Sequence, residues 1–277
     1  MDLWYTRSES QGTRYAMKVT RPLFSDAGST GRVDVLETED FGKALVVGGS
    51  VVLTDAEGFA HREMLAHTAL NVHPGAHSIL VIGGGDGGAI HELLRYPEVE
   101  RIVLVESDDV KMTASKRFFP DVASALSDPR VRVDGSDAVE FVRDTKERFD
   151  LLIAEYAPAV GREQSFYSDC FRMLSGDGIL VGPCGSAFFP LRRRELLSIA
   201  ARLKRLFPIF RLFRVDTISS EVGGCLVGFA SKRYDPVTDF DPARWSRHGI
   251  VTNYYTEELH RAAFALPKYL ADALEGA

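Results

Sequence analysis

The chain contains 277 residues, of which 45% are hydrophobic and 26% charged, with a formal net charge of −6 at pH 7. These proportions exclude a disordered chain and fit a globular protein of one domain with a smaller appendage. The acidic balance argues against nucleic acid as a partner, because phosphates require a basic surface. No apolar run approaches the roughly 18 residues of a membrane span. We therefore expect a small-molecule partner, no nucleic acid and no membrane.

The cysteines and the N-terminus favour a cytoplasmic location. The cysteines are few, odd in number and without metal-ligand spacing, which predicts neither disulfides nor a metal site; they are Cys170, Cys184 and Cys225. The first residues, MDLWYTRSES, lack the basic start and apolar core of a signal peptide. The basic run at residues 192–194 is interpreted as the solvated face of a helix.

Residues 1–58 predict a small N-terminal β-domain. The β-prone stretches are RYAMKVTRPLFS, GRVDVLETEDFG and KALVVGGSVVLT, and glycine turns at Gly42 and at Gly48 and Gly49 separate them. From residue 59 to 71, Phe59, Glu63, Met64, His67 and Leu70 recur at mixed three- and four-residue spacings, and residues 73–75, His-Pro-Gly, end the pattern. This spacing predicts a helix that leads into the main domain.

Residues 59–277 predict a Rossmann-like α/β domain of the class I methyltransferase type. The apolar strands SILVIGG, RIVLVES, RVRVDGS and FDLLIAEY alternate with the helical segments AIHELLRYP, VKMTASKRFF and AVEFVRDT. Continuous apolar strands indicate a doubly wound parallel sheet with helices on both faces. The strand GILVGPC, the helix RRELLSIAARLKRLFP and the strands IFRLFRVD and CLVGFASK would complete the sheet, with an antiparallel edge. The Asp- and Pro-rich residues 234–245 are expected to form a surface excursion.

The strongest local signal is VIGGGDGGAIHELL, residues 81–94, in which a buried strand meets a glycine-rich turn that opens a helix. Glycine permits positive φ angles and lets a ligand approach the backbone closely. The predicted binding turn contains Gly83, Gly84, Gly85 and Gly87. Such a turn alone can merely join a strand to a helix, so its function depends on the residues around it.

Three acidic residues around this turn predict an adenosyl site. Glu106 ends the next strand, where a carboxylate can accept hydrogen bonds from ribose hydroxyls, and Asp137 ends the following strand, near the expected adenine. Asp86 lies within the glycine turn itself, where its charge would repel a pyrophosphate and attract a cation. This combination favours a sulfonium nucleoside, S-adenosylmethionine or its decarboxylated form, over NAD.

Beyond these residues, the chain resembles the spermidine synthase family of polyamine aminopropyltransferases nearly from end to end. The similar segments, in family order, are LWYT, FGKALVVGG, LTDAEGFAHREMLAH, VIGGGDGG, LVESD, SDPRVRV, GILV and NYYTEELHRAAFALPKYL. The resemblance implies a homodimer or homotetramer. It also implies that Asp86 holds the amino group of the donor, Glu106 the ribose and Asp137 the adenine. Ser107, Ala138, His61 and Arg62 complete the predicted binding residues.

The acceptor half departs from the family pattern. Where the family has Asp-Ser-Ser-Asp-Pro, this chain has Glu155-Tyr156-Ala157-Pro158-Ala159, so Glu155 replaces the aspartate expected as general base. Two glutamines of the family correspond to Val52 and Pro183. Fewer carboxylates mean weaker attraction for putrescine, which makes putrescine doubtful as the acceptor. Arg62 could instead pair with a carboxylate, which would fit intact S-adenosylmethionine as the donor.

The predicted reaction is a displacement at a carbon next to the sulfonium, with Glu155 as the base and Tyr156 or His61 orienting the acceptor. We expect transfer of an aminopropyl or 3-amino-3-carboxypropyl group to an amine or amino acid, with release of methylthioadenosine. Three alternatives remain at this stage: a methyltransferase, ring closure of the donor, and a non-catalytic adenosyl-ligand sensor.

Overall fold

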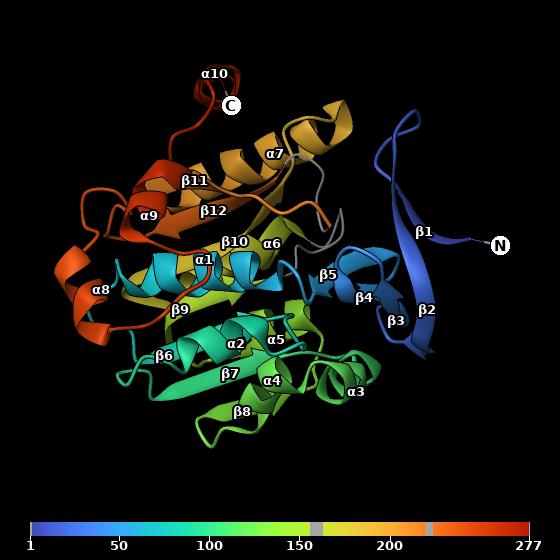
Figure 1. Cartoon of the computed structure of the whole chain (residues 1–277). Coiled ribbons are helices and arrows are strands. Elements are labelled where there is room, and N and C mark those ends of the chain that lie inside the picture. Colours follow the sequence, from blue (N-terminus) through green and yellow to red (C-terminus); the bar gives the residue numbers. More distant parts are fainter. Residues whose placement is uncertain (1, 156–162, 220–223, 277) are drawn as a thin grey trace.

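The computed structural model describes residues 2–155, 163–219 and 224–276, which form two β-sheets and their covering helices (Figure 1). The N-terminal sheet contains five strands, all antiparallel, in the order in which they follow one another along the chain. They are β1 (Leu3–Ser8), β2 (Arg14–Gly28), β3 (Gly31–Thr38), β4 (Gly42–Val47) and β5 (Ser50–Thr54). The predicted strands and glycine turns of this region are confirmed.

The main sheet contains seven strands in the order β11-β12-β10-β9-β6-β7-β8. Their bounds are β6 (Ser78–Ile82), β7 (Arg101–Val105), β8 (Val131–Asp134), β9 (Phe149–Ala154), β10 (Leu174–Gly185), β11 (Ile209–Val215) and β12 (Cys225–Ser231). Strands β6 to β10 are mutually parallel, and β12 runs antiparallel to both of its neighbours, β10 and β11. The Rossmann-like fold is therefore confirmed, but the antiparallel strand lies inside the sheet rather than at its edge.

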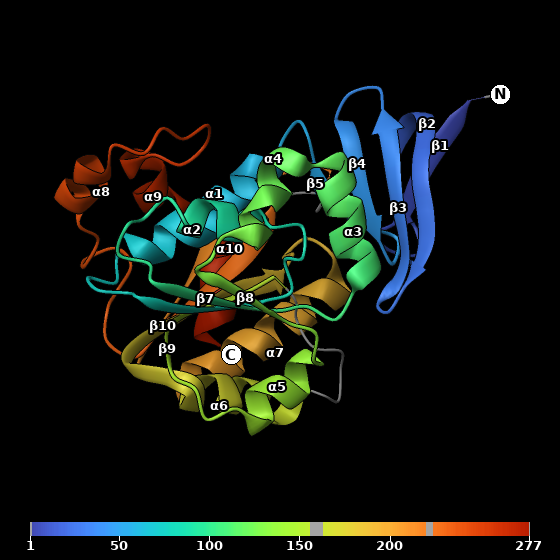
Figure 2. The same ribbon diagram turned by 90° about the horizontal axis from the view of Figure 1, so that it is seen from below.

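Helices cover both faces of the main sheet (Figure 2). One face packs on α1 (Gly58–Leu70), α2 (Gly88–Leu93), α9 (Glu257–Ala263) and the segment of α4 (Pro120–Ala123) with the 3₁₀ turn Ser124–Ser127. The other face packs on α5 (Ala138–Asp144), α6 (Glu163–Met173), α7 (Pro190–Leu206) and α10 (Lys268–Glu275).

Successive residues of the central strands alternate between the two cores. In β6, Ile79 and Val81 belong to the first core, whereas Leu80 and Ile82 belong to the second. Because residues 79–82 are all buried on one face or the other, this part of the strand is apolar without a break. This alternation explains the continuous hydrophobic runs from which the strands were predicted.

The C-terminal half differs from the sequence prediction in two places. Helix α6 was not predicted. Residues 234–245 are not purely a surface excursion, because Phe240 is buried and stacks on His260, and Pro242 begins α8 (Pro242–His248). Burial of Phe240 and Arg244 ties this segment to the domain.

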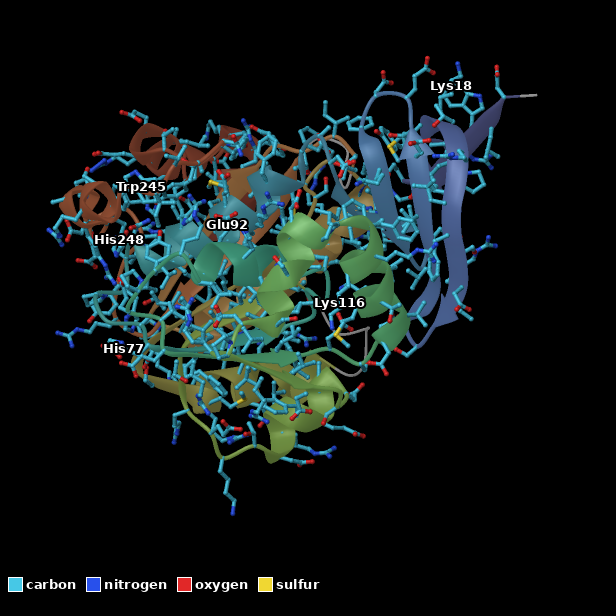
Figure 3. The ribbon with its side chains drawn as sticks, turned by 60° about the horizontal axis from the view of Figure 1, so that its bottom comes forward. Lys18, His77, Glu92, Lys116, Trp245 and His248 are labelled. Atoms are coloured by element: carbon cyan, nitrogen blue, oxygen red, sulfur yellow. The ribbon has the colours of Figure 1, made fainter. Side chains whose placement is uncertain are left out.

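The C-terminal segment is anchored to α1 by one buried carboxylate. Glu63, which is 1% exposed, accepts hydrogen bonds from the main-chain N–H groups of Asn253, Tyr254 and Tyr255 at 3.0, 2.8 and 2.9 Å. Trp245 and His248 lie at the end of the molecule opposite the N-terminal sheet (Figure 3). The helix α1 thus connects the region beside the N-terminal sheet with the C-terminal segment.

Helix α3 (Asp109–Phe118) joins the two sheets. Its Ala114, with the adjoining Phe119, shares a hydrophobic core with Val33, Val35 and Leu45 of the N-terminal sheet. At the β2–β3 turn, the Thr30 hydroxyl donates to Asp108 Oδ2 at 2.7 Å and the Ser29 hydroxyl donates to the Ser107 carbonyl at 3.1 Å. These contacts hold the β2–β3 turn against the carboxyl end of β7.

Candidate active site

The glycine turn between β6 and α2 makes room for two carboxylates. Gly83, Gly84 and Gly87 have positive φ angles, which other residues rarely adopt. A Cβ atom on Gly84 would lie 2.3 Å from Glu155 Oε1, and one on Gly85 would lie 2.7 Å from Glu106 Cγ. The turn therefore lets side chains from the ends of β9 and β7 close over the backbone.

Glu106 is fixed at the end of β7 by main-chain donors and a lysine. Its Oε1 accepts from the N–H of Asp108 at 3.0 Å, and its Oε2 accepts from the N–H of Gly85 at 3.1 Å and from Lys111 Nζ at 3.0 Å. Burial alone would lower the pKa of Lys111, but Glu106, Asp86 and Glu155 raise it above its usual value. Lys111 therefore remains a cation beside these three acidic side chains.

Asp86 is 4% exposed and lies at the start of α2. Its Oδ1 accepts a hydrogen bond from the N–H of Gly88 at 2.7 Å. Its negative charge acts on two neighbours, since it opposes the lowering of the His61 pKa and contributes to raising the Glu155 pKa. The charge of Asp86 thus acts both on the predicted base, Glu155, and on the predicted orienting histidine, His61.

Glu155 follows β9, and its N–H donates to the Ile82 carbonyl at 2.8 Å, which continues the sheet hydrogen bonding. Its Oε1 is buried and has no hydrogen-bond partner among the described residues. Burial, followed by the charge of Asp86, raises the pKa of Glu155 to about 8, against the opposite effect of Lys111. A carboxyl group whose pKa lies near neutrality is suited to proton transfer.

One cavity gathers the predicted adenosine-binding residues. Gly83, Glu106, Ser107, Asp137 and Ala138 line it together with Lys111 and Glu155. Asp137 Oδ1 also caps α5, accepting from the N–H groups of Val139 and Glu140 at 3.0 and 3.1 Å. Ser29 and Thr30 complete the wall from the β2–β3 turn, so the N-terminal sheet contributes to a cavity that was predicted from the main domain alone.

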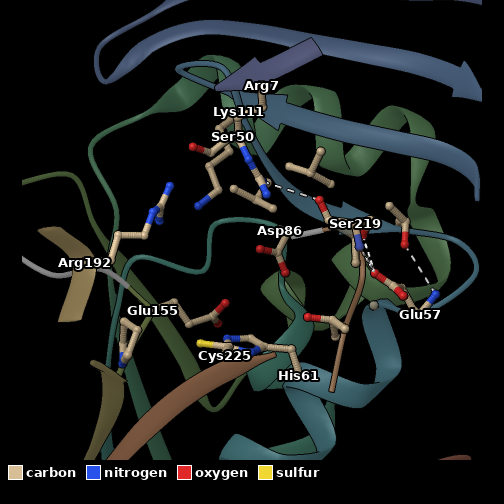
Figure 4. A pocket seen from close by; sticks show the side chains of 17 residues that line it. Arg7, Ser50, Glu57, His61, Asp86, Lys111, Glu155, Arg192, Ser219 and Cys225 are labelled. Carbon is tan, nitrogen blue, oxygen red and sulfur yellow. Dashed lines mark hydrogen bonds between the residues drawn. The ribbon is translucent and has the colours of Figure 1, made fainter. Parts of the chain in front are cut away.

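A second cavity adjoins the first and shares Val52, Lys111 and Glu155 with it (Figure 4). It is lined by His61, Asp86 and Pro183, as the sequence predicts for an arm and acceptor region, and also by Glu57, Arg7 and Arg192. Burial lowers the pKa of His61, so its ring is neutral at pH 7. Among the described lining residues, the carboxylates are Glu57, Asp86 and Glu155.

Arg62 is not placed as expected. Its Nε donates to Glu92 Oε1 at 3.2 Å, and Arg62 is absent from the described lining of both cavities. Glu92 is 1% exposed, and a buried carboxylate requires charged partners, which Arg62 and Arg95 provide. The structure therefore does not support Arg62 as a clamp for a substrate carboxylate.

Tyr156 and Pro158 lie outside the described residues.

The arginine run at residues 192–194 is also only partly a solvated face. Arg192 lines the second cavity and pairs with Glu9, while Arg193 Nε donates to the Ala187 carbonyl at 3.0 Å. Arg194 alone is exposed as predicted.

No helix in the described part of the chain is both long and apolar enough to cross a membrane. Within the same residues, no group of three or more His, Cys, Asp and Glu side chains is arranged to hold a metal ion.

Comparison with known protein families agrees with this geometry. Residues 58–241 match the family model described as "Spermine/spermidine synthase domain". The chain belongs to the spermidine synthase family. Residues 3–55 match a second model of this family, described as "Spermidine synthase tetramerisation domain".

Similar members of the spermidine synthase family cover essentially the whole chain. A polyamine aminopropyltransferase of Lachnospira eligens is 38% identical over 280 residues, covering 99% of this chain and 98% of the relative. One from Streptococcus pneumoniae is 36% identical with the same coverage. The crystal structure of spermidine synthase from Thermotoga maritima superposes with a TM-score of 0.93 at 29% identity, covering 99% of this chain and 95% of that one. A spermidine synthase in complex with the transition-state analogue AdoDATO gives 0.92 at 30% identity, covering 99% and 96%.

Proposed function

We propose that this spermidine synthase family member transfers an aminopropyl or 3-amino-3-carboxypropyl group from an adenosyl sulfonium donor to an amine and releases methylthioadenosine. The donor is S-adenosylmethionine or its decarboxylated form. The observation that carries this proposal is the position of Glu155, which lines both cavities and keeps an unpaired buried oxygen beside the glycine turn. A base at the junction of a donor cavity and an acceptor cavity is what a displacement reaction requires.

The acidic residues fit a cationic donor. In this proposal, Glu106 accepts a ribose hydroxyl, Asp137 lies at the adenine, and Asp86 attracts the cationic arm. A sulfonium carries no proton, so its attraction to Asp86 and Glu155 is purely electrostatic. Residues 59–277 would hold the donor, and residues 1–58 would close the cavity through Ser29 and Thr30, which line it.

Glu155 would accept the proton of the attacking amine. With a pKa of about 8, Glu155 is largely protonated at pH 7 in the absence of a ligand. A bound cation favours the carboxylate form and lowers this pKa, so donor binding would prepare the base for catalysis. The deprotonated amine then attacks the carbon next to sulfur, and the departing sulfur leaves as neutral methylthioadenosine. His61, neutral at pH 7, could orient the amine by a hydrogen bond.

The acceptor proposed here is an amine other than putrescine, or one bound in addition to it. Val52 and Pro183, which stand where the family has two glutamines, line the acceptor cavity and offer no polar side chain to a second ammonium group. We further propose a homodimer or homotetramer, supported by the match of residues 3–55 to a tetramerisation domain.

Product analysis tests this proposal. The purified protein is incubated with each donor separately, against a panel of amines and amino acids, and the products are analysed by mass spectrometry. Methylthioadenosine with an alkylated amine is the expected result. S-adenosylhomocysteine would indicate a methyltransferase, and methylthioadenosine without an alkylated acceptor would indicate ring closure of the donor. Tight binding without any turnover would indicate a sensor.

A further inference from the structure

Lys111, in the first turn of α3, lies where the two cavities meet. Among the residues that the structure describes, Lys111 and Glu155 are the charged or titratable side chains that line both cavities. Lys111 Nζ donates to Glu106 Oε2 at 3.0 Å, and the Lys111 side chain is 12% exposed. The ammonium group is thus held at the junction of the donor and acceptor cavities.

The hydrogen bond from Lys111 is additional to those that already satisfy Glu106. Each carboxylate oxygen of Glu106 accepts from the main chain, Oε1 from the N–H of Asp108 at 3.0 Å and Oε2 from the N–H of Gly85 at 3.1 Å. These main-chain donors fix the carboxylate, and the carboxylate in turn fixes the ammonium group of Lys111.

Two consecutive glycines bring the carboxyl groups of Glu106 and Glu155 together. A Cβ atom on Gly84 would lie 2.3 Å from Glu155 Oε1, and one on Gly85 would lie 2.8 Å from Glu106 Oε2. Both oxygens therefore pack on neighbouring residues of the same turn. An ammonium group bonded to Glu106 is consequently close enough to act on Glu155, whose Oε1 is buried without a hydrogen-bond partner among the described residues.

The charges around Glu155 oppose one another. Burial and then the charge of Asp86 raise the pKa of Glu155, whereas Lys111 lowers it. The pKa of Lys111 is itself raised, because the neighbouring acids outweigh the effect of its burial, so Lys111 stays charged in neutral and mildly basic solution. Figure 4 shows Lys111 and Glu155 on either side of Asp86. Without Lys111, Glu155 would face the negative charges of Asp86 and Glu106 alone.

We propose that Lys111 is a positioning residue for proton transfer: anchored by Glu106, its ammonium group stabilises the carboxylate form of Glu155. This inference rests on the proposed transfer reaction and adds a residue that acts through the base. The ammonium group exerts this effect from the donor side of the junction, so the acceptor cavity stays open to the amine.

The pH dependence of kcat/KM tests the role of Lys111. Lys111→Met and Lys111→Gln remove the charge, so the inflection assigned to Glu155 should move upward by about one pH unit. At pH 7, kcat/KM should therefore fall about tenfold, and above the new inflection it should return to within about threefold of the wild type. Lys111→Arg keeps the charge and should restore most of the profile. Lys116→Met is the matched control, because Lys116 is an exposed lysine of the same helix.

The comparison isolates position 111. The titration of the acceptor amine is common to all the proteins compared. The other charged or titratable side chains in the two linings are also unchanged; besides Asp86, Glu106 and Glu155 they are His61, Asp137, Glu57, Arg7, Arg192 and Cys225. Calorimetry with methylthioadenosine, which carries no charge, and thermal unfolding verify that each variant is folded and keeps its nucleoside site.

A purely structural role for Lys111 would lower kcat/KM by the same factor at every pH and leave the inflection in place, which would overturn the inference. A second measurement does not depend on turnover. In protein labelled with ¹³C-glutamate, the carboxyl signal that is lost in Glu155→Gln reports the titration of Glu155 directly. Equal titrations in wild type and Lys111→Met, in an active protein, would overturn this inference alone. Absence of any product from the wild type would overturn the proposed function, even if the two titrations differ.

Discussion

At the scale of single residues, the protonation of Glu155 controls the proposed chemistry. A base must be ionised to accept a proton, and the pKa of Glu155 is raised to about 8 by burial and by Asp86. The pH dependence of kcat/KM reports the pKa values of the free enzyme. Therefore kcat/KM should rise about tenfold per pH unit below pH 8 and level off above pH 8. Glu155→Gln should lower kcat by roughly 10²- to 10⁴-fold and remove this pH dependence.

Steady-state kinetics from pH 6 to 9.5 measure the profile, and calorimetry with methylthioadenosine verifies that the variant still binds the nucleoside. Glu258→Gln, an exposed residue of α9, is the control and should keep the wild-type profile. Full activity of Glu155→Gln would show that another group accepts the proton.

Gly84 provides a second residue-scale prediction. In Gly84→Ala, the new methyl group would lie 2.3 Å from Glu155 Oε1, at a φ angle of +73°. Glu155 would be displaced, so we expect kcat to fall by at least tenfold, together with a loss of stability of about 1 kcal/mol from the positive φ angle. Gly176→Ala is the control, because a Cβ atom at residue 176 would have no neighbouring atom within 4 Å and the φ angle of Gly176 is not positive. Equal kinetics for the two variants would mean that Glu155 does not act from this position.

At the scale of elements, the sequence predicts best what is local. The strands β6, β7 and β9 were found because burial on both faces requires unbroken apolar runs, and Glu106 and Glu155 were found because they follow those runs. The position of β12 between β10 and β11 was not found, because strand order depends on contacts between segments that are far apart in the chain.

The same reason explains which site residues were missed. Arg7 and Arg192 meet at Glu9 across most of the chain, and no local pattern indicates such a pair. The pairing of Arg62 with Glu92 was not anticipated, because the burial of Glu92 is not visible in the sequence. The contact between Lys111 and Glu106 could have been predicted from the sequence. Lys111 follows Glu106 by five residues, and a lysine in the first turn of the next helix can fold back onto such a carboxylate.

The connection between α1 and the C-terminal segment leads to an element-scale prediction. Glu63→Ala would leave the main-chain N–H groups of Asn253, Tyr254 and Tyr255 without their acceptor, at a cost of about 3 kcal/mol in the free energy of unfolding. Urea unfolding measures this difference, and Glu258→Ala, at an exposed position of α9, should change it by less than about 0.5 kcal/mol. A small effect of Glu63→Ala would mean that the C-terminal segment is held mainly by its hydrophobic contacts.

At the scale of the whole molecule, the site lies where the two sheets meet. The glycine turn, Glu106 and Glu155 come from the main sheet, while Ser29 and Thr30 come from the N-terminal sheet and line the same cavity. The Thr30 N–H donates to Asp108 Oδ2 at 3.2 Å, and Asp108 in turn caps α3 through the N–H of Lys111 at 3.0 Å. A nucleoside in this cavity would therefore contact both sheets and stabilise their association.

Hydrogen exchange measures this coupling. Saturation with methylthioadenosine should slow the exchange of the Thr30 amide and of the first turn of α3, in addition to residues 83–88, because a ligand stabilises the closed state by mass action. At a concentration of 100 times Kd, the stabilisation is about 2.7 kcal/mol, so exchange through opening of this interface should slow by about 100-fold. Amides of α8, at the opposite end of the molecule, are the internal control and should change much less. Protection confined to residues 83–88 and 106–108 would show that the N-terminal sheet takes no part in binding, and the assignment of Ser29 and Thr30 to the site would then be wrong.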